Sequence, residues 1–424
     1  MVLAIEGGSP FISETFSKYN PIQEQEIGAA NEVLTSGVLS DFLGAAGDKF
    51  LGGPRVLAFE KAASEQFGSK YCVSFNSWTS GLTAMVGSIP GLKAGDEIIT
   101  TPWTMSATAT AILQHGAIPV FADITEKDFQ PSRESIVSLI TPRTKAILSV
   151  DIFGRSSDYR MLLEICAEYD LLLFSDSAQA PGAKFEGKFI SQHPTVGGYS
   201  LNYHKHIHSG EGGFALTDDE ELANRMRLLR NHSESVVSVD QDEEVKLFLG
   251  SNYRLGELEA AIAKPQVERI DSIAEDRIRA AHALLGGLSQ LPGIKLPQPV
   301  NDRSNVFYIL PIIVPNLNGI SRDRLVEILR AEGIPGIVSK YTNIHRLPVF
   351  QSAKISPGEI YPWSANKNSI AANTYGYGAC PVAEDLFERR FFGIHMCAAE
   401  FSDLEVSAVI GAFGKVWNEL GWNE

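Results

Sequence analysis

Residues 144–176 have the sequence TKAILSVDIFGRSSDYRMLLEICAEYDLLLFSD, in which two different patterns of apolar residues alternate. Its two ends, TKAILSVDIF (144–153) and LLLFS (171–175), are short apolar runs typical of buried strands. Between them, after Asp158, apolar side chains recur every three or four residues, which is the spacing of an amphipathic helix. Since a helix commonly joins neighbouring parallel strands, the stretch predicts a βαβ unit.

The same alternation continues toward the N-terminus. Strand-like runs are YCVSF (71–75), DEIIT (96–100) and IPVFADI (118–124), and the segments between them carry helical patterns. Repeated alternation of this kind is typical of a mostly parallel sheet covered by helices on its faces. The sequence therefore predicts the α/β fold class.

The C-terminal half of the chain changes its pattern. From about residue 218 the sequence is mainly helical, and Pro265 is expected to interrupt or start a helix there. The strand-like VFYILPIIV (306–314) and the helical segment after it restart an α+β pattern. We expect an N-terminal region and large α/β domain over residues 1–290, and a smaller α+β domain over residues 291–424.

Composition narrows the class of protein. A chain of 424 residues with 44% hydrophobic content can bury a full enzyme core. Its net charge of -15 argues against binding nucleic acid or an anionic membrane, both of which require a concentrated basic surface. Apolar runs stay below the roughly 18–20 residues of a membrane span, and the N-terminus does not resemble a signal peptide. The expected compartment is the cytoplasm, with the four scattered cysteines reduced.

Lys205 lies between the strand-like YSLN (199–202) and the glycine turn GEGG (210–213). Glycines let the backbone approach a ligand closely, and a partly desolvated lysine becomes nucleophilic toward an aldehyde. The alternative is an ordinary solvated loop lysine, which is far commoner for a random lysine. The local pattern alone leaves both interpretations open.

Three histidines flank this lysine at alternating positions: His204, His206 and His208. On a strand they would point to one side, so geometry would permit a metal site. No carboxylate or cysteine ligand stands nearby at a known metal spacing. We therefore expect no metal, and we expect these histidines to pack and form hydrogen bonds around the loop.

Two further motifs follow predicted strands. Asp176 ends the strand LLLFS, at the edge where open α/β sheets bind ligands, and there it could hold a protonated pyridine nitrogen. A helix N-cap is an equally good interpretation of Asp176. Ser77-Trp78-Thr79 opens a helical stretch after YCVSF, where hydroxyl and N–H groups can form a phosphate seat, although plain helix capping is common at such positions.

The order of these motifs is more specific than any one of them. Along the chain stand Ser77-Trp78-Thr79, Asp176 to Gln179, Ser200 five residues before Lys205, the GEGG turn, and Gly250-Ser251-Asn252-Tyr253-Arg254 followed by Glu257. In this order the chain resembles, over nearly its whole length, the DegT/DnrJ/EryC1/StrS sugar aminotransferases of the fold-type I pyridoxal phosphate class.

The resemblance implies pyridoxal phosphate as the cofactor and a role for each motif. Lys205 would form the Schiff base and shuttle a proton, Asp176 would bind the pyridine nitrogen, and Gln179 would lie near the ring hydroxyl. The phosphate would be held by Ser77, Thr79, Ser200 and the backbone of Trp78. Asn252 would reach the phosphate of the neighbouring subunit, which makes the expected protein a homodimer with shared active sites.

Two positions depart from the family pattern. Trp78 stands where family members usually have glycine, and Thr104-Met105 replaces the usual threonine-aromatic pair. Trp103 is the nearest candidate to stack on the cofactor ring, although a tryptophan at a strand end more often packs in the core. His345, in TNIHRLPVF (342–350), resembles a substrate-side histidine of the family.

The resemblance implies transfer of an amino group from L-glutamate or L-glutamine to a keto sugar, a nucleotide-linked keto sugar or a keto-cyclitol. A related class of dehydratases replaces the lysine with histidine, whereas this chain keeps Lys205. A regulatory member of the same fold without turnover is the other alternative, but the lysine, aspartate and hydroxyl positions are all present.

Overall fold

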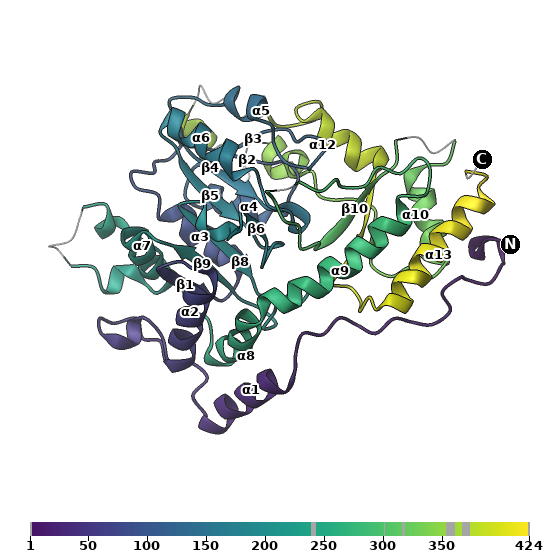
Figure 1. Cartoon of the computed structure of the whole chain (residues 1–424). Coiled ribbons are helices and arrows are strands. Elements are labelled where there is room, and N and C mark those ends of the chain that lie inside the picture. Colours follow the sequence, from purple (N-terminus) through teal and green to yellow (C-terminus); the bar gives the residue numbers. More distant parts are fainter. Residues whose placement is uncertain are drawn as a thin grey trace.

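The structure is a computed structural model that describes residues 2–238, 243–300, 302–315, 319–352, 361–366 and 374–422. Figure 1 shows a large sheet covered by helices beside a second, smaller sheet. The strands are β1 Tyr71–Phe75, β2 Glu97–Thr100, β3 Ile118–Phe121, β4 Thr144–Val150, β5 Leu172–Asp176, β6 Lys184–Phe185, β7 Lys188–Phe189, β8 Val196–Ser200, β9 Gly213–Thr217, β10 Ile309–Ile313, β11 Ile337–Val338 and β12 Phe391–His395.

Helices alternate with the strands of the large sheet and dominate the C-terminal third. Their bounds are α1 Glu24–Ser36, α2 Pro54–Phe67, α3 Trp78–Gly87, α4 Ala107–Gln114, α5 Arg133–Val137, α6 Tyr159–Tyr169, α7 Glu220–Arg230, α8 Glu257–Glu268, α9 Ile270–Leu288, α10 Arg322–Ala331, α11 Pro348–Gln351, α12 Pro381–Asp385 and α13 Asp403–Glu419.

The large sheet has seven strands in the order β1-β9-β8-β5-β4-β2-β3. The run β8-β5-β4-β2-β3 is parallel, while β9 is antiparallel to both of its neighbours. The predicted α/β class is confirmed, and β4, α6 and β5 form the βαβ unit that the sequence of residues 144–176 predicts.

Alternate side chains of the strands enter two separate hydrophobic layers. On β5, Leu173 packs with α2, α6 and α8 on one face of the sheet, whereas Phe174 packs with α3, α4 and α7 on the other. Ile147 and Leu148 of β4 divide in the same way. Both faces are covered, which is why these strands are apolar at nearly every position.

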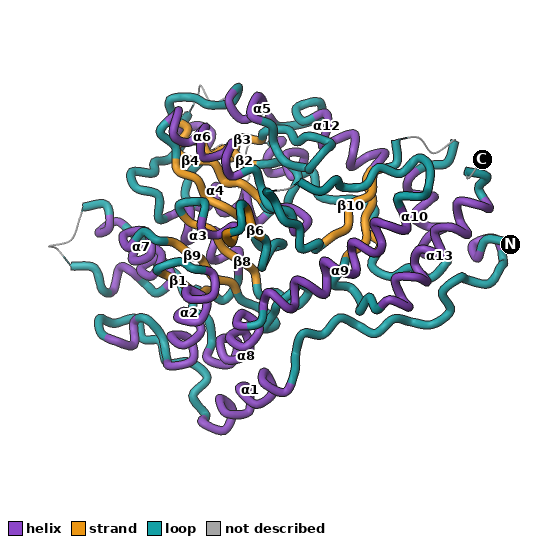
Figure 2. Tube along the Cα trace, in the orientation of Figure 1, coloured by secondary structure: helices purple, strands orange, loops and turns teal. Residues whose placement is uncertain are grey.

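The second sheet is antiparallel and has the order β10-β12-β11. Figure 2 shows its strands apart from those of the large sheet. The hydrophobic cluster beneath it combines α10, α13 and the C-terminal half of α9, and it includes Leu3 and Ile12 from the N-terminal segment. The N-terminal segment therefore lies beside the C-terminal helix, as Figure 1 shows.

Two expectations about local structure differ from the structure. Pro265 lies inside α8 and does not interrupt it; the break between α8 and α9 is at Arg269. Pro265 removes one N–H near the helix end, and the neighbouring Gln266 side chain donates to the Ile262 carbonyl at 3.0 Å. The strand predicted over residues 306–314 is shorter, because Phe307 has a φ of +53° and β10 begins only at Ile309.

Among the described residues, no helix combines the length and the apolarity that crossing a membrane requires.

Candidate active site

Lys205 lies in a turn-rich loop between β8 and β9. Backbone hydrogen bonds join Leu201 to Gly212 and Tyr203 to Gly210 across this loop, and Lys205 N–H donates to the Asn202 carbonyl at 3.0 Å. Gly210 and Gly212 have φ values of +92° and +143°, which favour glycine. The GEGG turn therefore closes the loop that carries the lysine.

The Lys205 side chain is buried, with 8% of the residue exposed, so the solvated-loop alternative is wrong. Its Nζ lies 4.3 Å from the centre of the Tyr308 ring. Burial lowers the pKa of Lys205 to about 8, and the nearby Asp176 and Cys397 act in the opposite direction. A substantial fraction of the amine is therefore neutral near pH 7–8, the form that attacks a carbonyl carbon.

Two neutral imidazoles lie on the Tyr308 side of the lysine. The ring of His395 lies 4.6 Å from that of Tyr308 and 6.2 Å from that of His204. Burial lowers the pKa of His395 to about 3 and that of His204 to about 4, and the positive charge of Lys205 adds to both shifts. Both histidines are uncharged at neutral pH, so they add no positive charge beside the lysine.

Asp176 ends β5 beside the lysine and is itself buried. Its Oδ1 accepts a hydrogen bond from Trp78 Nε1 at 2.8 Å, and its Oδ2 accepts one from Thr108 Oγ1 at 2.7 Å. A turn follows Asp176, not a helix, so the helix N-cap alternative is wrong. The carboxylate is held from both sides at the carboxyl edge of the parallel strands.

Gln179 lies on the other side of this edge. Its Oε1 accepts from the backbone N–H of Phe153 at 2.9 Å, and its Nε2 donates to the Tyr341 hydroxyl at 2.6 Å. Phe153 adopts a φ of +62°, a conformation that non-glycine residues adopt at a cost of about 1–3 kcal/mol. This backbone fixes which end of the Gln179 amide is the donor that faces Tyr341.

The proposed phosphate seat is the first turn of α3. The hydroxyl of Ser77 caps this helix by accepting the N–H of Ser80 at 3.1 Å, and Thr79 is exposed in the same turn. Gly213, which pairs with Ser200 across β8 and β9, lies so close that a Cβ on it would be 2.6 Å from the Cα of Trp78. The first turn of α3, which carries Ser77 and Thr79, therefore lies against the β9 residue that pairs with Ser200.

Asn252 lies in a segment that runs beside this turn. The side chain of Asn76 donates to the Asn252 carbonyl at 3.2 Å, and the Asn76 N–H donates to the Tyr253 carbonyl at 2.8 Å. The role of the Asn252 side chain across a subunit interface stays a prediction.

Trp103 and His345 lie in settings different from those expected. Trp103 is fully buried among Phe129, Tyr341 and Phe391, so its rings pack in the core. Met105, which stands at the position where the family usually has an aromatic residue, is 57% exposed. His345 is also fully buried, and its Nε2 lies 3.0 Å from Oε1 of Glu384, so this ring supports the structure and is not presented to a substrate.

The other histidines pack as expected, although not on a strand. His206 Nε2 pairs with the Val306 carbonyl at 2.9 Å, and the backbone of His208 exchanges two hydrogen bonds with the Gln266 side chain. Because the segment is a loop of turns, the alternation that suggested a metal site does not apply. Across the described ranges, no three His, Cys, Asp or Glu side chains gather closely enough to hold a metal ion.

Three residues of this site carry no motif in the sequence. Thr108 donates to Asp176, Tyr341 accepts from Gln179, and the Tyr308 ring lies beside the Lys205 amine. Burial raises the pKa of Tyr341 to about 12, so its hydroxyl is protonated at neutral pH. Thr108 lies close in sequence to Thr104-Met105, whereas Tyr308 directly precedes β10 and Tyr341 lies in the loop after β11.

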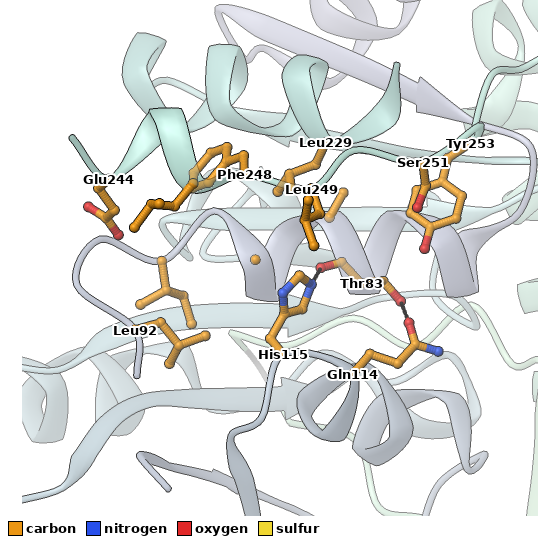
Figure 3. A pocket seen from close by; sticks show the side chains of 14 residues that line it. Thr83, Leu92, Gln114, His115, Leu229, Glu244, Phe248, Leu249, Ser251 and Tyr253 are labelled. Carbon is orange, nitrogen blue, oxygen red and sulfur yellow. Dashed lines mark hydrogen bonds between the residues drawn. The ribbon is translucent and has the colours of Figure 1, made fainter. Parts of the chain in front are cut away.

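A cavity of about 560 Å³ lies elsewhere, and Figure 3 shows its lining side chains. It is bordered by α3, the end of α4, α7 and the segment 244–253, with His115 bonded to the Thr83 carbonyl and Gln114 to the Thr83 hydroxyl. None of the predicted site residues lines it. The cavity is therefore lined by residues other than those gathered around Lys205.

The residues around Lys205 fit pyridoxal phosphate. A buried amine whose pKa is lowered to about 8 suits an aldehyde. A carboxylate held by two side-chain donors and by the Ala178 N–H at 3.3 Å suits a pyridinium nitrogen. The N-terminus of α3 beside Ser200 suits a phosphate. This fold and this site define a fold-type I pyridoxal phosphate dependent aminotransferase.

Comparison with known proteins gives the family. The sequence profile of the DegT/DnrJ/EryC1/StrS aminotransferase family matches residues 24–391, and the chain belongs to this family. It is 32% identical over 361 residues to a candidate L-glutamine:3-amino-2,3-dideoxy-scyllo-inosose aminotransferase of Streptoalloteichus tenebrarius, covering 82% of each chain. It is 31% identical over 281 residues to the GDP-perosamine synthase of Caulobacter vibrioides, covering 66% of this chain and 74% of the relative.

Among solved structures, the chain is similar to Helicobacter pylori PseC, an aminotransferase involved in the biosynthesis of pseudoaminic acid. The TM-score is 0.80 at 25% identity, and the match covers 96% of this chain and all of PseC.

Proposed function

We propose that this chain transfers an amino group from L-glutamate or L-glutamine to the ketone of a sugar, a nucleotide-linked sugar or a cyclitol. The observation that carries the proposal is the buried Lys205, whose pKa is lowered to about 8, beside the doubly held carboxylate of Asp176. The names of the two curated relatives support an acceptor of this class, since one refers to an amino-inosose and the other to a GDP-linked sugar.

Each residue around the proposed cofactor site would have a separate role. Pyridoxal phosphate, when bound, supplies an aldehyde and a ring that withdraws electrons from the reacting carbon. The Lys205 amine would hold that aldehyde and, once released, would move a proton to and from the reacting carbon. The Asp176 carboxylate would keep a proton on the ring nitrogen, and the Gln179 amide would face the ring hydroxyl. Ser77, Thr79, Ser200 and the Trp78 N–H would bind the phosphate.

One lysine and one carboxylate would serve both the donor and the acceptor. The amine of Lys205 can take part in only one of the two half-reactions at a time. The donor must therefore leave as its keto acid before the ketone enters, and steady-state kinetics should be ping-pong.

We also propose a homodimer in which Asn252 completes the site of the neighbouring subunit. The segment from residue 27 to residue 57 supports this proposal, because it exposes large apolar side chains: Ile27, Leu34, Val38, Leu39, Leu43, Leu51 and Leu57. Burial against a second subunit would remove these side chains from water.

The test compares acceptors in the presence of L-glutamate and of L-glutamine. Keto sugars, nucleotide-linked keto sugars and scyllo-inosose are incubated beside aliphatic and aromatic 2-keto acids, and the aminated products are quantified by mass spectrometry. We expect amination of at least one ring ketone and poor turnover of the simple keto acids. Good turnover of the keto acids with failure of every ring ketone would show an ordinary amino-acid transaminase.

The same assay distinguishes dehydration. A dehydratase would return a product that has lost a hydroxyl group without gaining nitrogen. The retained Lys205, buried beside Asp176, favours amination.

A further inference from the structure

Trp78 departs from the family pattern, and its side chain points into the protein. The residue is 4% exposed, although it begins helix α3 at the proposed phosphate seat. Its Nε1–H donates to Oδ1 of Asp176 at 2.8 Å, while Thr108 Oγ1 donates to Oδ2 at 2.7 Å. The indole is thus one of two side-chain donors on the carboxylate.

Two glycines make room for this indole. A Cβ on Gly198 of β8 would lie 2.0 Å from Cη2 of Trp78, and a Cβ on Gly81 of α3 would lie 2.6 Å from its Cε3. Neither glycine has a positive φ, so the backbone conformation does not require glycine there. The space taken by the indole explains why side chains are missing at these two positions.

We propose that Trp78 is a positioning residue that acts through Asp176. This inference rests on the proposed function, because it takes Asp176 as the partner of the cofactor's ring nitrogen. A hydrogen bond from a neutral donor stabilises a carboxylate more than a carboxylic acid. The indole N–H therefore keeps the negative charge on Asp176 and fixes the plane of the carboxylate, so that the shared proton stays on the ring nitrogen.

Packing alone would predict a different behaviour. A phenyl ring in place of the indole would fill part of the same space, but it could not donate and would not reach the position of Cη2 beside Gly198. The two explanations therefore separate in a variant that removes the N–H and keeps the bicyclic shape, and the phenyl variant is interpreted beside a control that loses the same volume.

The experiment uses holoenzyme loaded with pyridoxal phosphate that carries ¹⁵N in the ring. In Trp78→Phe we expect the ring-nitrogen chemical shift at neutral pH to move from the pyridinium value toward that of neutral pyridine. We expect kcat to fall about tenfold with KM within about twofold, the pattern of a lost transition-state interaction.

Trp417→Phe is the matched control. Trp417 is 1% exposed, and its Nε1 donates to the Pro292 carbonyl at 2.9 Å in the cluster of the second sheet. The same substitution there removes one buried indole hydrogen bond away from Asp176. We expect Trp417→Phe to lower the melting temperature while leaving the ring-nitrogen shift and kcat unchanged.

A second replacement covers the case in which Trp78→Phe does not fold. Incorporation of 3-benzothienylalanine at position 78 exchanges the N–H for sulfur and keeps the bicyclic shape. Unchanged ring-nitrogen shift and kcat in this protein would overturn the inference and leave Trp78 a packing residue. Asp176→Asn separates that failure from a failure of the proposed function. If Asp176→Asn gave the same ring-nitrogen shift as the wild type, Asp176 would not be the partner of the ring nitrogen.

Discussion

The Lys205 amine is kept in an environment that favours its uncharged form. Tyr308 presents a ring to it, and the nearby His204 and His395 are neutral at pH 7. Burial is the largest cause of the lowered pKa of Lys205. Burial of this amine therefore lowers the stability of the folded protein and increases the reactivity of the lysine, a common relation at active sites.

Lys205→Met should raise the free energy of unfolding of the cofactor-free protein at pH 7 by up to about 3 kcal/mol, the difference between a pKa of about 8 when folded and 10.5 when unfolded. The unfolded chain binds more protons than the folded chain between these two values. Wild-type stability should therefore rise with pH from about 8 to about 10.5, and the variant should lack this rise. Urea denaturation at several pH values measures both effects.

The same variant must lose transamination, because methionine offers no amine. A Lys205→Met protein that unfolds with the wild-type pH profile would show that Lys205 titrates normally. Such a result would contradict the environment described for its amine.

Some site residues could be recognised from sequence motifs, whereas others are identified only by their contacts in the structure. The two groups differ in the sequence around them. Lys205, Asp176 and Ser200 adjoin strands and glycine turns of one continuous α/β pattern, so the sequence indicated them. Tyr308 and Tyr341 approach from the second sheet and its loop, and no local spacing links them to Lys205. Trp103 and His345 are residue types that could contact a cofactor or a substrate, but both side chains are fully buried. Their burial depends on contacts with residues distant in the sequence, which a local sequence pattern does not show.

At the scale of elements, the loop after β4 is bound by two hydrogen bonds to the segment that directly precedes β10. The Val306 N–H donates to the Gly154 carbonyl and the Tyr308 N–H donates to the Phe153 carbonyl, each at 2.9 Å. Phe153 and Phe307 both have positive φ values. This join sets the position of the Tyr308 ring beside Lys205 and of the Phe153 N–H on Gln179.

Gly154→Ala should disturb this join. Gly154 has a φ of +91°, and a Cβ there would lie 2.7 Å from the backbone nitrogen of Tyr308. We expect a loss of about 3 kcal/mol or more in unfolding free energy, from left-handed strain together with the steric clash. Urea denaturation measures the loss, and the visible absorbance of the bound cofactor reports the surroundings of Lys205.

Gly187→Ala is the comparison. Gly187 has a φ of +79° in the exposed turn between β6 and β7, and a Cβ there would meet no atom within 4 Å. It should lose only about 1 kcal/mol, the strain without the clash, and its cofactor spectrum should be that of the wild type. Equal losses in the two variants would mean that the join tolerates displacement.

The elements themselves were largely predictable. β1 begins and ends where YCVSF does, and β2, β3 and β5 lie within about one to three residues of the predicted bounds, because two buried faces make these strands continuously apolar. β10 and α8 were not predicted correctly in detail. The left-handed Phe307 and the helical Pro265 both depend on tertiary contacts that offset an unfavourable local preference.

On the scale of the whole molecule, helix α9 belongs to both hydrophobic cores. Ile270 and Ala274 pack with the large sheet, whereas Leu284 and Leu288 pack beneath the second sheet. A domain boundary near residue 290 stays a prediction. The helical pattern gave no sign that one helix serves two cores.

Shared active sites can be tested by mixing subunits. Lys205→Ala and Asn252→Ala chains, carrying different tags, are co-expressed, and the heterodimers are purified through both tags. If Asn252 acts across the interface, each heterodimer contains one site with both residues intact and should show about half the wild-type activity. Homodimers of each variant provide the baseline. A monomer in solution, or heterodimers as inactive as the Lys205→Ala homodimer, would contradict sharing.

The N-terminal segment has a consequence for biosynthesis. Leu3 and Ile12 are buried among side chains of α10 and α13, and the Ile12 N–H donates to the Glu332 carbonyl at 3.0 Å. A ribosome releases this segment long before it makes the helices that receive it. The apolar side chains around Leu3 and Ile12 therefore stay accessible to chaperones until α10 and α13 have emerged.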